Sequence, residues 1–131
     1  MEWKAHYVLG IDPMDATHRE FVDLVAAMSQ VGDDAAIPLL ERFIAHSEAH
    51  FEQEARWMEA SGFPPIHCHV DEHQRVIAAL HDVLNTARRG DPGLTRVIAR
   101  EMAAWFENHA ATMDTALALH LKRVRFDIEA H

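Results

Sequence analysis

Five histidines and two carboxylates recur along this 131-residue chain at spacings that suit metal coordination. In the stretch HFEQEARWMEASGFPPIHCHVDEH, His50 and Glu54 are four residues apart, and so are His69 and His73. Residues at i and i+4 share one face of a helix, so each pair can present two ligands in one direction. Imidazole-rich sites favour iron, zinc, copper or nickel. The candidate ligands are His18, His50, Glu54, His69, His73, His109 and Asp114.

Four helices are needed to position these residues, and the hydrophobic pattern predicts four. Apolar residues recur at helical spacing over about 13–31, 35–61, 66–89 and 93–124, after an arm over 1–12 with Asp12 as the expected N-cap. The connecting stretches GDD, SGFPP and RRGDPG are short, which favours antiparallel neighbours. The sequence therefore predicts an all-α fold, an up-down-up-down antiparallel four-helix bundle that forms one domain over 1–131.

The candidate ligands also fall at one level of this predicted bundle. Two residues at one level of an antiparallel helix pair are equidistant from the turn between their helices. The midpoint of His50 and His73 and that of Glu54 and His69 both lie between residues 61 and 62, in SGFPP. The midpoint of His18 and His50 lies at residue 34, in the first turn. The midpoints of His73 with His109 and of His69 with Asp114 lie near residue 91, in the third turn. Burying several ionisable groups costs several kcal/mol each unless they are paired or bind metal, so we expect a buried metal site.

The number of ligands indicates two metal ions. Five imidazoles and two carboxylates are too many for one ion, and a structural zinc site would be closed, tetrahedral and usually rich in cysteine. Two octahedral ions that share both carboxylates and one bridging oxygen would have one coordination position left over. Such a site can bind a small molecule.

Composition narrows the class of protein further. The formal net charge of -9 disfavours nucleic acid and anionic membranes as partners. No apolar stretch is long enough for membrane insertion, and the first residues lack the pattern of a signal peptide. The single cysteine, Cys68, cannot form an internal disulfide. These features predict a cytoplasmic protein.

Nearly the whole chain resembles the bacterial hemerythrins, within the hemerythrin-like HHE family. The motifs are GIDPMDATHREF, HFEQEARWM with GFPP and HCHVDEH, and WFENHAATMD. The resemblance implies a centre of two Fe ions with an oxo or hydroxo bridge, in a non-heme protein that binds O2 reversibly and is not an enzyme. It assigns His69, His73 and His109 to one iron and His18 and His50 to the other, which keeps the open position. Glu54 and Asp114 would bridge the two irons.

The same resemblance implies an apolar O2 pocket lined by Phe21, Trp105, Phe106 and Ala110. Ala110 stands where relatives often carry a bulky aliphatic residue, which could alter this pocket. The pair His109 and Asp114 poses a geometric problem, because residues at i and i+5 lie roughly 140° apart on an ideal helix. Either they reach the metals from different sides or the helix is locally deformed.

Other functions compatible with this site are a di-iron oxidase or peroxidase, an enzyme that detoxifies nitric oxide, and a stand-alone O2 or redox sensor. Ferritin-like di-iron enzymes use Glu-x-x-His motifs, and this sequence contains none. A site rich in histidine and poor in carboxylate favours binding over oxidative chemistry. His46 and His81 are expected at ordinary polar positions, and Cys68 is not expected to be a ligand.

Overall fold

The computed structural model describes residues 1–131 and contains helices but no strands. The main helices are α1 (Asp12–Gln30), α2 (Asp33–Ser61), α3 (Ile66–Arg88), α4 (Leu94–His109) and α5 (Thr115–Arg123). A π-helical segment, η2 (Ala110–Asp114), joins α4 to α5, and short 3₁₀ helices occur at η1 (Ala5–Tyr7) and η3 (Ile128–Ala130).

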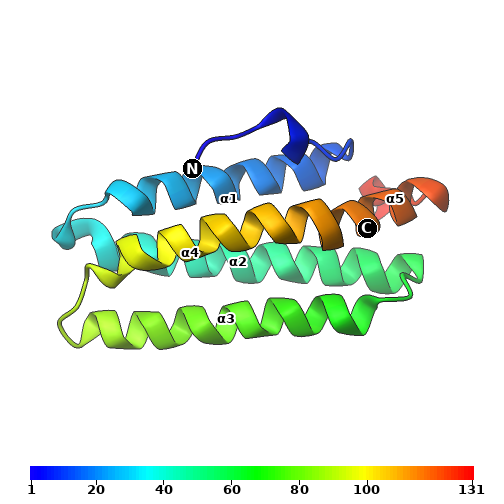
Figure 1. Ribbon diagram of the computed structural model, residues 1–131. Coiled ribbons are helices and arrows are strands. Elements are labelled where there is room, and N and C mark those ends of the chain that lie inside the picture. Colours follow the sequence, from blue (N-terminus) through cyan, green and yellow to red (C-terminus); the bar gives the residue numbers. More distant parts are fainter.

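The helices form the predicted antiparallel four-helix bundle, with α1, α2, α3 and the composite α4–η2–α5 helix side by side (Figure 1). Helix α1 packs against α2 and α4, and α3 packs against the same two helices. The N-terminal arm crosses the outside of the bundle, where the Tyr7 ring packs against Phe106 of α4. The all-α prediction is therefore confirmed.

The turns have the local geometry that their residues favour. Gly62 ends α2 in the left-handed conformation, with φ 69°, and the amide of Phe63 donates to the carbonyl of Met58 at 2.9 Å. This is a Schellman-type helix end, which a glycine adopts without steric cost. The sharp reversal places α3 directly beside α2.

The expected N-cap role of Asp12 is wrong. Ile11 occupies the N-cap position without a side-chain cap, and Asp12 is the first helical residue. The carboxylate of Asp15 instead accepts hydrogen bonds from the backbone amides of Leu9, at 2.8 Å, and Gly10, at 3.1 Å. Asp15 thus ties the arm to the first turn of α1, as a carboxylate near a helix N-terminus can.

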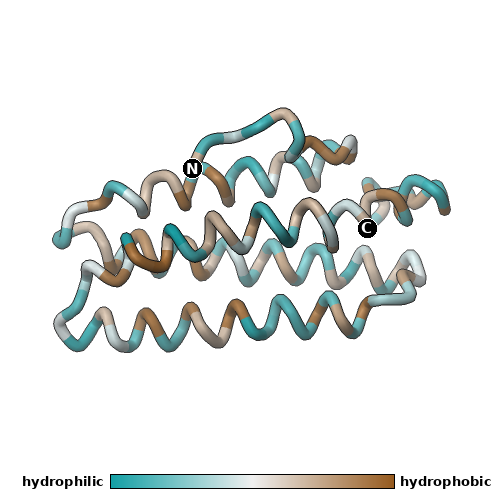
Figure 2. The backbone as a smooth tube through the Cα atoms, viewed as in Figure 1, coloured by the Kyte–Doolittle hydropathy of each residue, from teal (hydrophilic) through white to brown (hydrophobic).

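Polar and apolar residues alternate along every helix, as the bands of colour in Figure 2 show. The buried apolar residues form two separate clusters. The larger contains Phe21, Phe43, Leu80 and Phe106, and the smaller contains Met14, Trp57 and Leu117 among others. Each long helix passes from one cluster to the other through its candidate metal ligands. The bundle therefore has a polar layer between two apolar cores.

Candidate metal centre

All seven candidate ligands are buried in this polar layer. Their exposed fractions run from 0% for His18 to 4% for His50. Helices α1 and α4 each provide one histidine, α2 provides a histidine and a glutamate, α3 provides two histidines, and η2 provides the aspartate. The helical spacing that suggested each pair therefore does place the side chains on inward faces.

Glu54 lies between two groups of histidines. Its Oε2 is 3.2 Å from His18 Nε2 and 2.8 Å from His50 Nε2. Its Oε1 is 3.4 Å from His69 Nε2 and 3.6 Å from His73 Nε2. One carboxylate thus has one oxygen facing each group, which is the arrangement that a bridging ligand needs.

Asp114 repeats this arrangement from the opposite helix. Its Oδ1 is 3.2 Å from the Nε2 atoms of both His69 and His109, and its Oδ2 is 3.3 Å from His18 Nε2. The Nε2 atoms of His73 and His109 are 3.1 Å apart. The structure therefore separates a group of three histidines from a group of two and joins the groups through two carboxylates.

The chemistry of these atoms fits a cation. Glu54 Oε1, Asp114 Oδ1 and His69 Nε2 are buried and make no hydrogen bond of good geometry. Buried polar atoms without partners are costly, and metal ligation would satisfy them. Two sets of ligand atoms converge closely enough to hold an ion: Glu54 with His69, His73, His109 and Asp114, and His18 with His50 and Glu54.

Both carboxylates are held in the ionised form. Burial opposes ionisation of Glu54, but attraction to His50 and hydrogen bonds from His18 and His50 outweigh it and hold the pKa of Glu54 well below its usual value. Burial and the neighbouring Glu54 raise the pKa of Asp114, but the imidazoles of His109 and His69, each with Nε2 3.2 Å from Oδ1, outweigh them and hold the pKa below its usual value. Two buried negative charges side by side favour the binding of positive charge.

The π-helical segment explains how His109 and Asp114 reach the same centre. The amide of Thr115 donates to the carbonyl of Ala110, an i to i+5 bond, and the Thr115 hydroxyl donates to the same carbonyl at 2.7 Å. The extra residue in this turn brings positions five apart toward one face, whereas an α-helix would separate them. Of the two possibilities that the sequence left open, local deformation is the one observed.

Aromatic side chains cover the ligands. Phe106 lies 5.3 Å from His18 and Phe21 lies 6.1 Å from His50, measured between ring centroids. Trp105 stacks on His109 at 4.3 Å, with an angle of 17° between the rings. Phe21, Phe106 and Ala110 are buried, whereas Trp105 is half-buried. Phe21, Trp105 and Phe106 therefore lie beside candidate ligands, and Ala110 directly follows the ligand His109 in the chain.

Phe51 also lies at the centre, although it was not among the residues expected there. Its ring stacks on His73 with a centroid distance of 3.9 Å and an angle of 6°, the closest aromatic contact of any of the candidate ligands. A signal was available, because Phe51 lies three residues before Glu54 and so shares its helix face.

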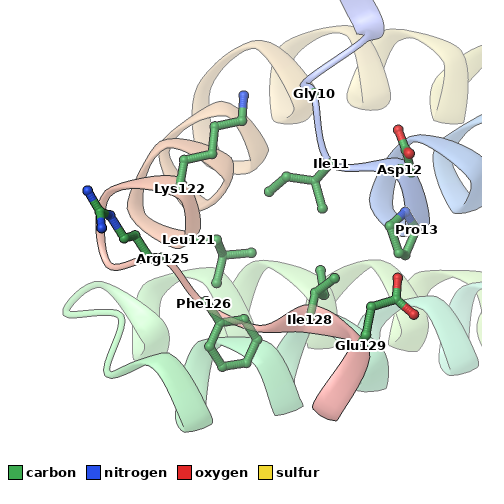
Figure 3. A pocket seen from close by; sticks show the side chains of 10 residues that line it. All are labelled: Gly10, Ile11, Asp12, Pro13, Leu121, Lys122, Arg125, Phe126, Ile128 and Glu129. Atoms are coloured by element: carbon green, nitrogen blue, oxygen red, sulfur yellow. The ribbon is translucent and has the colours of Figure 1, made fainter.

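The other singled-out residues lie outside the cluster. His46 is half-buried, with Nδ1 3.5 Å from Glu20 Oε2, and His81 is exposed, with Nε2 3.4 Å from Glu48 Oε1. Cys68 is exposed. A surface cavity of about 320 Å³, lined by the arm and the C-terminal segment, contains none of the candidate ligands (Figure 3).

A four-helix bundle with a buried centre of histidines and two linking carboxylates defines a class of cation-binding proteins. A model of the hemerythrin HHE cation binding domain matches residues 9–119. A bacteriohemerythrin from Ralstonia nicotianae is 37% identical over 121 residues, which cover 92% of this chain and 88% of the relative. The chain belongs to the hemerythrin HHE family. No helix has the length and apolar character required to cross a membrane.

Proposed function

We propose that this chain is a non-heme di-iron protein that binds O2 reversibly, for storage, delivery or scavenging. The observation that carries the proposal is the division of the ligands into a group of three histidines and a group of two, joined by both Glu54 and Asp114. The similarity to a bacteriohemerythrin supports the choice of iron and of O2. When bound, two ferrous ions supply the two electrons that reversible O2 binding requires.

In this proposal the residues have distinct roles. His69, His73 and His109 would hold one iron and His18 and His50 the other, with Glu54 and Asp114 available to both. The two-histidine group supplies fewer protein ligands, so O2 would bind on its side. A cytoplasmic location is part of the proposal, in line with an exposed, unpaired cysteine.

The apolar residues beside the centre would protect bound O2. Phe21 and Phe106 provide apolar surface next to the two-histidine group, and Ala110 belongs to the same buried apolar cluster. An apolar wall excludes the water and protons that would convert bound O2 into a released, reduced product. This arrangement suits a binder better than an enzyme, which must admit a second substrate.

Optical spectroscopy tests the proposal. The reduced protein should be nearly colourless without O2, develop a visible band when O2 is added and lose it when O2 is removed under argon, over repeated cycles. Irreversible oxidation on first exposure to O2, or rapid turnover of peroxide or nitric oxide with a reductant, would favour a di-iron enzyme instead.

A further inference from the structure

Of the four residues expected to line the O2 pocket, Trp105 is the one that reaches the protein surface. Its indole ring stacks on His109 at 4.3 Å and lies 6.2 Å from Phe21 and 5.8 Å from Phe51, between ring centroids. Phe21 and Phe106 are fully buried, whereas Trp105 is half-buried. The ring therefore covers one face of the candidate ligand His109 and is itself partly open to solvent.

A single polar contact fixes the indole to the neighbouring helix. The Trp105 Nε1–H of α4 donates to Glu72 Oε1 of α3 at 2.9 Å. The other oxygen of this carboxylate, Oε2, accepts from Arg75 Nη2 at 2.6 Å. Because Arg75 lies on the same helix, three residues further on, it restricts the carboxylate to the orientation that faces the indole.

The contact is well placed to control access. Glu72 directly precedes His73 in the chain, but its side chain is 28% exposed, accepts from Trp105 Nε1 and does not belong to the cluster of candidate ligands. A hydrogen bond with an ionised acceptor is stronger than a neutral one. Without it, no polar contact would fix the ring, which would be held only by stacking on His109 and by packing against Phe21 and Phe51.

We propose that Glu72 is a positioning residue, which holds Trp105 against His109 on one side of the metal centre and so limits the entry of water and small anions from that side. This inference rests on the proposed function, because it concerns the wall of the same site. Glu72 itself contacts none of the candidate ligand atoms in the structure and acts through the tryptophan.

Azide, a small anion, is the probe for access. Glu72→Leu should increase the rate of azide binding to the oxidised protein by about two- to tenfold, the factor expected for the loss of one hydrogen bond. Glu72→Gln should restore much of the wild-type rate, since its amide oxygen can accept from the indole. The matched control is Glu41→Leu. It removes an exposed ion pair between Glu41 and Arg88, whose N···O distance of 2.6 Å equals that of the Glu72–Arg75 pair. Neither residue belongs to the cluster of candidate ligands.

A measurement without metal tests the contact by itself. The chain has three tryptophans, so protein labelled with 5-fluorotryptophan should give three ¹⁹F resonances, and Trp105→Phe identifies the relevant one. In the metal-free protein, Glu72→Leu should shift or broaden that resonance, and Glu41→Leu should leave it unchanged. A protein that binds no iron would refute the proposed function, while the ¹⁹F experiment would still decide on the contact.

A double-mutant cycle separates positioning from a general effect on the fold. In the Trp105→Phe background no indole N–H remains, so Glu72→Leu should cause no further increase in the azide rate. An equal increase in both backgrounds would overturn the proposal, and so would an unchanged azide rate in a folded Glu72→Leu protein.

Discussion

His109 and Asp114 are five positions apart in the sequence, and yet His109 Nε2 lies 3.2 Å from Asp114 Oδ1. The π-helical segment between them makes this possible, because it places one extra residue in the turn. A regular α-helix through this region would turn Asp114 away from His109 by roughly 140° and leave the two groups of histidines joined through Glu54 alone. The centre therefore depends on a local backbone deformation.

Thr115 stabilises that deformation, since its hydroxyl and its amide both donate to the carbonyl of Ala110. Thr115→Val should lower the free energy of unfolding by about 1 kcal/mol, the usual value of one hydrogen bond. It should also weaken iron retention, because the π-helical turn that positions Asp114 loses one of the two hydrogen bonds from Thr115 to Ala110. Thermal unfolding and iron analysis after dialysis measure the two effects. Thr86→Val is the control. It removes a hydrogen bond from an exposed hydroxyl of α3 to the carbonyl of Asp82, and it should leave iron content unchanged.

Iron content tests the assignment of ligands. The wild-type protein should approach two irons per chain, and Glu54→Ala should lose the coupled pair because Glu54 faces both histidine groups. His46→Ala should keep both irons, since His46 faces Glu20 and lies outside the cluster. Elemental analysis of folded samples is the measurement. An empty site in His46→Ala together with a full site in His50→Ala would mean that the assignment on α2 is wrong.

Ala110 should determine how long bound O2 survives. This residue is 2% exposed and belongs to the same buried cluster as Phe21 and Phe106. Ala110→Ile should slow autoxidation by filling space that water can otherwise enter, at a cost of ~1–3 kcal/mol in stability if the core is overpacked. The decay of the absorption of the O2 complex in air gives the rate, with the melting temperature as control. Equal decay rates in wild type and a stably folded variant would contradict this role.

Tyr7 should make stability depend on alkaline pH. Burial, together with the hydrogen bond to Glu107 and its charge, raises the pKa of Tyr7 from its ordinary value of 10 to about 12. The unfolded chain therefore loses the phenolic proton first, so this contribution to stability is complete below pH 10 and is lost as the pH rises toward 12. Between pH 8 and pH 10.5 the wild type should lose ~0.5–1 kcal/mol more stability than Tyr7→Phe. Chemical denaturation at both pH values tests this, and parallel losses in the two proteins would refute it.

The helical periodicity was sufficient to predict the fold class. Four segments carried apolar residues at helical spacing, and short turns rich in glycine and proline allowed only antiparallel neighbours. The sequence also predicted that the candidate ligands lie at one level of the bundle. The number of residues between each ligand and the turn determines which residues of two antiparallel helices lie opposite each other. Seven side chains could therefore be grouped from the sequence alone.

Helical periodicity did not predict which side chains contact one another across the bundle. The sequence left two explanations for His109 and Asp114, because spacing does not reveal where a helix changes its hydrogen-bond pattern, and the choice depends on packing and on the Thr115 hydroxyl. It also did not indicate the stacking of Phe51 on His73 or the bond between Glu72 and Trp105. Periodicity determines which face of a helix a residue occupies, and so the sequence by itself determined the bundle and its layer of ligands. Rotamers and interhelical packing determine which atoms meet, and so only the tertiary structure decided how the carboxylates link the two histidine groups and which aromatic rings cover them.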